Sequence, residues 1–209
     1  DINPATLEPI GLFQKASMDD VNHAVDSAEE AFDSWRTTPP PQRAKILYRA
    51  ARLLEERKEE LARLMTMENG KVLPEARGDV QEAIDMAYYA AGEGRRLFGE
   101  TTPSELPDKF CMTVRRPIGV VGLITPFNFP LAIPAWKIMP ALISGNTVVL
   151  KPSSDTPLLA IELIKILSHA GVPGGVINLV TGVGSEAGAA LVKSRKVKAI
   201  SFTGSLEPG

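Results

Sequence analysis

Residues 119–130 read GVVGLITPFNFP, and this stretch decides the fold. Its first six residues are apolar or glycine and carry no charge, which is typical of a strand buried on both faces of a sheet. The next six contain two prolines and form a short, stiff turn. An apolar helix is predicted from about Pro130 to Ile143, so the stretch begins a strand–turn–helix unit of a parallel sheet.

The alternation of strand and helix continues to the end of the chain. The predicted elements are a strand over 147–150, a helix from Thr156 or Pro157 to Ala170, a strand over 176–180, a helix over 185–193 and a strand over 197–202. Short connections join them, as in βαβ crossovers with helices on both faces of a parallel sheet. A further short strand is predicted over 114–116.

The first half of the chain is predicted to be helical. Its predicted elements are a loop with an edge strand over 1–16, a helix from Ser17 to the prolines at 39–41, a helix from Gln42 to Glu68 and a helix from Pro74 to Phe98. Ser17 and Asp20 have the spacing of a capping box. The fold class is therefore α/β, with a helical scaffold segment over 1–110 and a Rossmann-like parallel sheet over 111–209.

Composition and charge narrow the class of protein. The 209 residues carry 23 basic and 25 acidic side chains and are 44% hydrophobic, as expected of a globular chain. Residues 1–110 hold 21 acidic and 14 basic side chains, whereas residues 111–209 hold 4 and 9. This positive balance favours an anionic ligand, but no basic cluster interleaved with aromatics predicts a nucleic-acid groove.

Several absences in the sequence point to one compartment. No apolar run reaches the roughly 18 residues that span a membrane. The N-terminus shows no secretory signal, and the single cysteine excludes an intrachain disulfide framework. We therefore expect a cytoplasmic protein with neither a membrane nor a nucleic acid as its partner.

The turn after the first buried strand contains a candidate for chemistry. Asn128 stands between two aromatic residues at the end of that strand, where open parallel sheets bind ligands. An amide in a dry cleft can donate a hydrogen bond to a developing oxyanion. On these residues alone, a turn-forming asparagine between core aromatics explains the pattern as well.

The turn after the second buried strand contains a lysine. Lys151 ends this strand and is followed by Pro152, Ser153 and Ser154. Its ammonium can reach a ribose hydroxyl or a phosphate over the sheet edge, and the serines add hydroxyl donors. Asp155 or Thr156 is expected to cap the next helix. A lysine whose stem lies along the sheet beside a helix cap is the alternative.

The last two turns are rich in glycine. Residues 181–188 resemble the G-x-G-x-x-G dinucleotide fingerprint but are one residue too long, so a tight strand-to-helix turn explains them equally. Residues 202–209 have a G-x-x-x-x-G spacing that suits a pyrophosphate at the start of a helix. His23 and His169 have no partner at metal-ligand spacing, and Cys111 precedes the sheet, so we expect no metal site and a structural thiol.

Taken together, these turns resemble the aldehyde dehydrogenase superfamily. The matching stretches, in order, are ITPFNFP (124–130), PAL (140–142), GNTVVLKPS (145–153), GVP (171–173), GVIN (175–178), TGVG (181–184) and ISFTGS (200–205). The resemblance covers nearly the whole chain, including the N-terminal helices. It implies an enzyme that oxidises an aldehyde to a carboxylic acid with NADP or NAD as the cofactor.

The resemblance also implies roles for single residues. Asn128 is the implied catalytic donor to the aldehyde oxygen, and Lys151 the implied partner of the adenosine ribose or of a 2′-phosphate. Gly184 and Gly188 resemble glycines near the adenine. The implied cofactor-binding residues are Ile124, Thr125, Pro126, Phe127, Lys151, Pro152, Ser153, Ser154, Gly184, Gly188, Phe202, Gly204 and Ser205.

The sequence departs from the family pattern at its end. The family's catalytic cysteine and general-base glutamate lie beyond the pyrophosphate turn, and this sequence ends before either. We therefore expect a fragment of the enzyme that is inactive by itself. The family usually reads Gly-Ser-Thr-Glu-x-Gly here, whereas this chain has Leu206 and Pro208, and Pro208 lacks an amide donor in the first turns of the expected helix.

Cofactor and substrate preferences follow from the same resemblance. Many NAD-preferring members have a glutamate at the position of Ser154, and a neutral serine near Lys151 favours NADP instead. Residues 127–128 and 133–137 resemble those of enzymes that act on small semialdehydes, such as succinic or 2-oxoglutaric semialdehyde. A homo-oligomer is expected at full length. The alternative is a truncation that binds a nucleotide without catalysis or serves a structural role.

Overall fold

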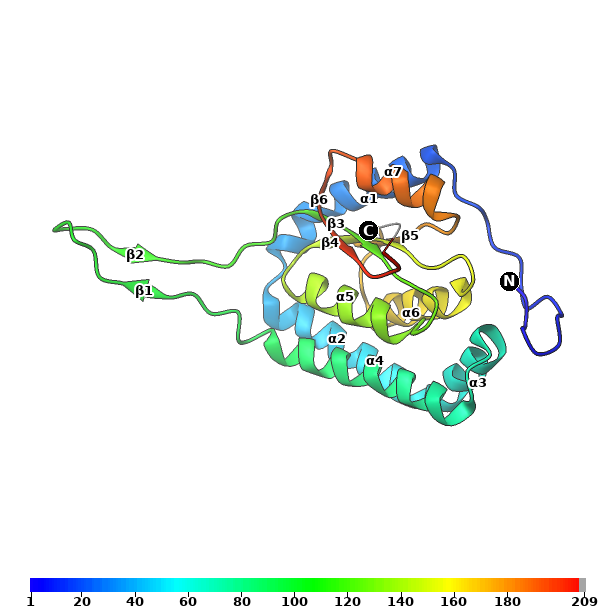
Figure 1. Ribbon diagram of the computed structural model, residues 1–209. Helices are drawn as coiled ribbons and strands as arrows, with labels where there is room; N and C mark the ends of the chain where they lie inside the picture. The colour runs from blue at the N-terminus through cyan, green and yellow to red at the C-terminus, as the bar shows by residue number, and fades with distance from the viewer. Residues whose placement is uncertain (207–209) are drawn as a thin grey trace.

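A four-stranded parallel sheet lies at the centre of the structure (Figure 1), a computed structural model that describes residues 1–206. Across the sheet, its strands are β5 (Ile177–Leu179), β4 (Thr147–Lys151), β3 (Val120–Ile124) and β6 (Val197–Phe202). The chain enters at β3, moves outward to β5 and returns to the other side of β3 with β6. The direction of winding therefore reverses at β3, which confirms the predicted α/β fold with a parallel sheet.

Helices cover both faces of the sheet (Figure 1). On one face lie α1 (Met18–Thr37), the π-helical turn η1 (Gly184–Gly188) and α7 (Ala189–Lys193). On the other face lie α5 (Ala132–Ile143) and α6 (Pro157–Ala170), backed by a further layer of α2 (Pro40–Glu56), α3 (Lys58–Asn69) and α4 (Leu73–Glu93). The N-terminal helices thus pack directly on the helices that follow β3 and β4.

The side chains of the strands alternate between two apolar clusters. Val148 and Leu150 belong to the cluster shared with α5 and α6, whereas Val149 belongs to the cluster shared with α1 and α7. All three are fully buried, and each contributes on the order of 1.5–3 kcal/mol by leaving water. Because neighbouring residues of a strand face opposite sides, Lys151 shares the side of Val149.

A two-stranded arm projects away from the rest of the structure (Figure 1). It contains β1 (Thr101–Thr102) and β2 (Cys111–Met112), which pair antiparallel. The predicted strand over 114–116 is wrong, because pairing with β1 stops at Met112 and Arg115 instead donates from its Nε to the carbonyl of Phe98.

Two predicted helices have different bounds in the structure. The helix predicted over 42–68 is broken at Arg57 into α2 and α3, and the guanidinium of Arg57 pairs there with Glu162 of α6 at 2.8 Å. The apolar spacing continues through the break and so conceals it. The helix predicted to reach Phe98 ends at Glu93. The next residue, Gly94, packs against α2, where an added Cβ would lie 2.5 Å from the Cβ of Ala44.

Other predicted elements differ in smaller ways. The edge strand predicted within residues 1–16 is a single bridge between Ile2 and Pro9. The capping box of Ser17 and Asp20 is confirmed, since both reciprocal hydrogen bonds form. Among residues 1–206, no helix has both the length and the apolar character needed to cross a lipid bilayer. The division of the chain at residue 110 stays a prediction.

Candidate functional site

The predicted site residues of three strands lie in one row at the carboxyl edge of the sheet. The strand register pairs Ile124 of β3 with Lys151 of β4 on one side and with Phe202 of β6 on the other. Hydrogen bonds continue the row into the turns, from Thr125 N to Lys151 O at 3.2 Å and from Thr203 N to Ile124 O at 3.1 Å. Residues 125–130 and 152–156 therefore leave the sheet side by side and begin α5 and α6.

Lys151 is buried at the end of β4, with 5% of its surface exposed. Its Nζ donates to the carbonyl oxygen of Pro152 at 2.8 Å, and no carboxylate forms an ion pair with it in the part of the chain that the structure describes. Burial lowers the pKa of the Lys151 ammonium below its ordinary value, although the charge of Asp155 opposes this effect. An anionic group bound near the ammonium would compensate for this lost solvation.

The glycine-rich turn after β5 approaches the same lysine. An added Cβ at Gly188 would lie 3.8 Å from Cδ of Lys151, so the end of η1 packs against the lysine stem. Gly184, at the start of η1, is exposed and has no neighbour within 4 Å of the place of a Cβ. The backbone at Gly184 is thus open to solvent, while Gly188 lies beside the stem of Lys151 at a distance that a Cβ could also occupy.

The turn that contains Asn128 lies on the surface at this edge. Phe127, Asn128 and Phe129 are exposed, whereas Thr125 is buried at the end of β3. No hydrogen bond to the Asn128 side-chain amide forms within residues 1–206, so this amide is free to donate to a ligand. Phe129 stacks on Trp136 of α5, with 6.4 Å between ring centroids.

The remaining predicted cofactor residues differ in exposure. Pro152 is buried, Ser153 half-buried and Ser154 exposed. Phe202, Gly204 and Ser205 are exposed beside β6, the strand at the edge of the sheet. Pro208, which the sequence places in the first turns of an expected helix after this turn, lies outside the described residues.

Sequence reasoning missed the residues that cap α5 and α6. The prediction that Asp155 or Thr156 caps α6 is wrong, since Thr156 makes no capping hydrogen bond. Instead, the carboxylate of Glu68 at the end of α3 accepts from the amides of Leu158 and Leu159. The predicted caps failed because the acceptor comes from a helix 90 residues away in sequence, which no local pattern reveals.

The start of α5 is capped in the same way. Oδ1 of Asp79, a residue of α4, accepts from the amide of Ala132 at 2.8 Å. Asp79 is fully buried and forms an ion pair with Lys71 at 2.9 Å. Burial raises the pKa of Asp79 above its ordinary value, and the hydrogen bond from Lys71 opposes that rise. Acidic side chains from two N-terminal helices therefore cap both helices that begin at the candidate site.

The carboxyl group of Glu68 has a raised pKa. It is buried at the start of α6, and burial raises its pKa from 4.5 to about 7, although the hydrogen bonds from Leu158 and Leu159 oppose the shift.

A second lysine, Lys137 of α5, also lies at the carboxyl edge of the sheet. Its Nζ donates to Oγ of Ser201 at 2.7 Å, and burial lowers the pKa of its ammonium. The local signal for Lys137 was weak, since it stands within an apolar helix.

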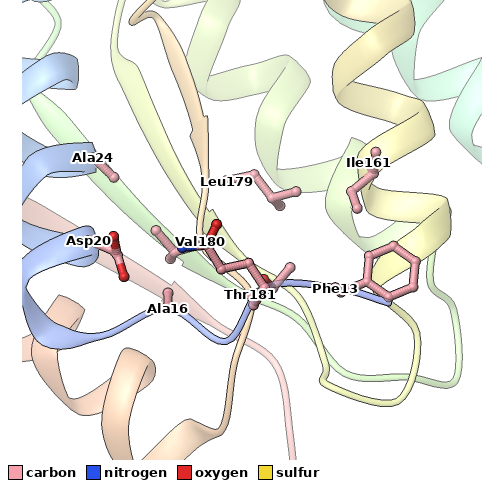
Figure 2. A pocket seen from close by; sticks show the side chains of 9 residues that line it. Phe13, Ala16, Asp20, Ala24, Ile161, Leu179, Val180 and Thr181 are labelled. Carbon is pink, nitrogen blue, oxygen red and sulfur yellow. The ribbon is translucent and has the colours of Figure 1, made fainter. Parts of the chain in front are cut away.

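A pocket of about 320 Å³ lies beside this row, at the end of β5 (Figure 2). Its lining residues are Phe13, Gln14, Ala16, Asp20, Ala24, Ile161, Leu179, Val180 and Thr181. The amide of Ala16 donates to the carbonyl of Thr181 at 2.8 Å, so the N-terminal segment crosses the carboxyl end of β5. None of the predicted site residues lines this pocket, and we place no ligand in it.

The residues set aside as weak candidates lie apart from the row. His23 on α1 and His169 on α6 are exposed, and Cys111 is half-buried in the arm. Among residues 1–206, no group of three or more His, Cys, Asp or Glu side chains is arranged to hold a metal ion.

The strand order and the row of turns at one edge define a doubly wound α/β protein, a class in which ligands bind at that edge. Comparison with known sequences then gives the family. The sequence model described as "Aldehyde dehydrogenase family" matches residues 1–209, so the chain belongs to the aldehyde dehydrogenase family.

Two curated relatives are similar along the whole chain. The 2,5-dioxopentanoate dehydrogenase of Saccharolobus solfataricus is 45% identical over 213 residues, which cover 100% of this chain and 44% of the relative. The alpha-ketoglutaric semialdehyde dehydrogenase of Bacillus subtilis is 46% identical over 208 residues, covering 99% of this chain and 43% of the relative. The chain thus spans less than half the length of these relatives.

A solved structure confirms the fold. The betaine aldehyde dehydrogenase of Staphylococcus aureus in complex with NAD+ matches with a TM-score of 0.96 and 38% sequence identity. The match covers 99% of this chain and 41% of that structure. The helices and the sheet described here are therefore arranged as in part of a known aldehyde dehydrogenase.

Proposed function

We propose that the complete protein oxidises a small aldehyde to a carboxylic acid with NADP or NAD as the hydride acceptor. One observation carries this proposal: the buried Lys151 and the turn of Asn128 leave adjacent strands at the same edge of the sheet. The first offers a cation to a nucleotide, and the second offers a free amide to a reacting oxygen. The family assignment supports both roles.

The residues at the edge fit a dinucleotide. Lys151 is buried and forms no ion pair with a carboxylate within residues 1–206. Gly184 is exposed and begins η1, whose last residue, Gly188, lies beside the stem of Lys151. Lys151, Ser153 and Ser154 would hold the adenosine ribose, with Ile124–Phe127 as the wall of the site. Gly184 and Gly188 would lie near the adenine, and Phe202, Gly204 and Ser205 would line the pyrophosphate. The bound cofactor supplies the acceptor for the hydride of the aldehyde.

Asn128 would act on the substrate rather than on the cofactor. Its exposed amide would donate to the aldehyde oxygen as negative charge develops there. This donation would lower the barrier by stabilising the negative charge as it forms. The nucleophile would belong to the longer protein, since Cys111, the only cysteine of this sequence, lies in the projecting arm.

The substrate class we propose is a small semialdehyde that carries a carboxylate. Residues 127–128 and 133–137 resemble those of semialdehyde enzymes. The two relatives described above are named for 2,5-dioxopentanoate and alpha-ketoglutaric semialdehyde, which are two names of one compound. This compound is our first candidate, followed by succinic semialdehyde.

Oligomerisation and location complete the proposal. We infer that the full-length protein forms a homo-oligomer through the arm, which exposes Phe98, Phe110 and Met112 without covering them in its own chain. Apolar side chains that project together into water are typical of a protein interface.

A cytoplasmic location fits a chain whose 209 residues contain one cysteine.

The test is steady-state oxidation by the purified full-length protein. We expect reduction of NADP or NAD, followed at the absorbance of the reduced nicotinamide, with 2,5-dioxopentanoate giving a higher kcat/KM than succinic semialdehyde, malonate semialdehyde or glyceraldehyde. Nucleotide binding without any reduction across this panel would favour the alternative, a protein that binds a nucleotide without catalysis. The isolated 209-residue chain is expected to reduce neither cofactor.

A further inference from the structure

The turn that contains Asn128 is held through its backbone by the end of a helix far away in sequence. Nδ2 of Asn69, the last residue of α3, donates to the carbonyl oxygen of Phe127 at 2.8 Å. Nζ of Lys71 donates to the carbonyl oxygen of Asn128 itself at 2.8 Å. Two consecutive carbonyls of one exposed turn are thus fixed by two side chains of a single segment.

The backbone of that segment directs both donors to the turn. Gly70 ends α3 with a backbone φ of 78°, in the left-handed region. Residues other than glycine rarely adopt this conformation. The reversal at Gly70 brings Asn69 and Lys71 to the same side of the chain. Asn69, Gly70 and Lys71 are called the clamp below.

The ammonium of Lys71 is itself fixed in three directions. It forms an ion pair with the fully buried carboxylate of Asp79 at 2.9 Å and lies 4.1 Å from the ring centroid of Phe129. Its third contact is the carbonyl of Asn128. The Lys71 side chain is 10% exposed, so little water competes for these contacts.

Asp79 connects this clamp to the helix that follows the turn. Its Oδ2 accepts from Lys71, and its Oδ1 accepts from the amide of Ala132 at the start of α5. One carboxylate therefore fixes both ends of residues 128–132: the carbonyl of Asn128 through Lys71, and the first amide of α5 directly. The position of the Asn128 backbone, and hence of its side-chain amide, depends on this carboxylate.

We propose that Lys71, held by Asp79, is a positioning residue that sets the location of the Asn128 amide for the reaction. This inference rests on the function proposed above, because it gives Lys71 an effect only through Asn128. Lys71 would touch neither substrate nor cofactor. A displacement of a reacting group by about 1 Å can slow a reaction on the order of 100-fold, so loss of the clamp should reduce turnover strongly.

A double-mutant cycle in the full-length enzyme tests the proposal. Lys71→Met keeps the apolar stem and removes the ammonium. We expect it to lower kcat on the order of 10–100-fold with 2,5-dioxopentanoate, while the dissociation constant of NADP changes less than about threefold. In an Asn128→Ala background the same substitution should cost less than about threefold, because the amide that it positions is already gone.

Two further variants keep the test decisive. Asp79→Asn preserves an acceptor for the amide of Ala132 but removes the charge that holds Lys71; it should reproduce the kcat loss and its dependence on Asn128, even if Lys71→Met fails to fold. Lys58→Met is the matched control. Lys58 also joins α3 to α4, through Oε1 of Gln81 at 2.6 Å, but does not touch the turn, so kcat should not change.

The outcomes separate the two proposals. If Asn128→Ala lowers kcat as expected while Lys71→Met lowers it by the same factor in both backgrounds, Lys71 acts independently of Asn128 and the inference is overturned. Unchanged kcat in both Lys71→Met and Asp79→Asn overturns it as well. If Asn128→Ala has no effect on kcat, the proposed role of Asn128 fails, and the inference fails with it.

Discussion

At the scale of single residues, the site combines a buried cation with an exposed amide. Lys151 is buried, and burial lowers the pKa of its ammonium, so an anionic group at this edge would favour the charged form. Asn128 has no competing hydrogen bond to its amide within residues 1–206 and so can donate to substrate. The proposed roles of the two side chains therefore differ, with Lys151 acting on the cofactor and Asn128 on the aldehyde oxygen.

Replacing Asn128 should affect turnover and spare the cofactor. Asn128→Ala in the full-length enzyme is expected to lower kcat by roughly 10²–10³-fold, the usual effect of removing one oxyanion donor. The dissociation constant of the cofactor, measured by titration of protein fluorescence, should change little. Unchanged turnover together with lost cofactor binding would assign Asn128 a structural role in its turn.

Ser154 should control the choice between cofactors. It is exposed and neutral and stands three residues after Lys151, so its own side chain does not repel a 2′-phosphate. Wild type is expected to prefer NADP, and Ser154→Glu should shift the ratio of kcat/KM values toward NAD through repulsion of the phosphate. Ser104→Glu, an exchange in the arm, serves as the control. A wild type with strong NAD preference, insensitive to Ser154→Glu, would show that other residues recognise the ribose.

At the scale of elements, the first turns of α5 and α6 depend on acceptors from other helices. Asp79 of α4 caps α5, and Glu68 of α3 caps α6. The first amides of a helix have no partner within the helix, and an outside carboxylate satisfies them while matching the positive end of the helix dipole. Packing of the N-terminal helices therefore fixes where both site turns end.

The cap of α6 should make stability depend on pH. The folded pKa of Glu68 is raised to about 7, above its unfolded value near 4.5. The folded state therefore keeps a proton that the unfolded chain releases, and the free energy of unfolding should fall as pH rises from about 4.5 to about 7, by on the order of 3 kcal/mol at most.

The comparison variant for this effect is Glu68→Gln, which keeps one acceptor and cannot ionise. Urea unfolding of both proteins at intervals between pH 4 and pH 8 measures the effect. The stability of wild type relative to Glu68→Gln should decrease across this range. A constant difference would show that the carboxyl group of Glu68 titrates at the same pH in both states.

At the scale of the whole molecule, two parts of the chain have different roles. The helices pack on both faces of the sheet around two apolar clusters, whereas the arm of β1 and β2 extends away from them (Figure 1). The arm exposes the apolar side chains of Phe110 and Met112. Apolar side chains that stay exposed in the arm gain no stabilisation from burial within their own chain. Its stabilisation is expected to come from contact with another copy.

Charged substitutions in the arm should therefore reduce assembly without unfolding the chain. Phe110 is 76% exposed and Met112 is 62% exposed, so Phe110→Asp with Met112→Asp costs the single chain little. We expect the full-length variant to have a smaller molar mass by light scattering after size-exclusion chromatography. Tyr89→Asp, at a 66% exposed position of α4, should leave the mass unchanged. An unchanged mass for the arm variant would place the interface elsewhere.

Much of the architecture could be predicted from the sequence, because local rules govern it. Uncharged apolar runs at 119–124 and 147–150 specify strands buried on both faces, and the intervening helices specify their parallel pairing. The capping box of Ser17 and Asp20 is also local, since its partners stand three residues apart. The order of the turns along the chain was sufficient to indicate the family.

Only the tertiary structure decided which distant groups meet. The apolar spacing continues unchanged through the break between α2 and α3. The guanidinium of Arg57 at this break pairs with Glu162 of α6, which is distant in sequence. The caps from Glu68 and Asp79, and the clamp on the Asn128 turn, join residues more than 50 positions apart. A backbone N–H donates to any acceptor that packing brings within reach, so its partner follows from the arrangement of helices rather than from neighbouring residues. The sequence by itself therefore determined the elements and their order, and packing determined how the candidate site is held.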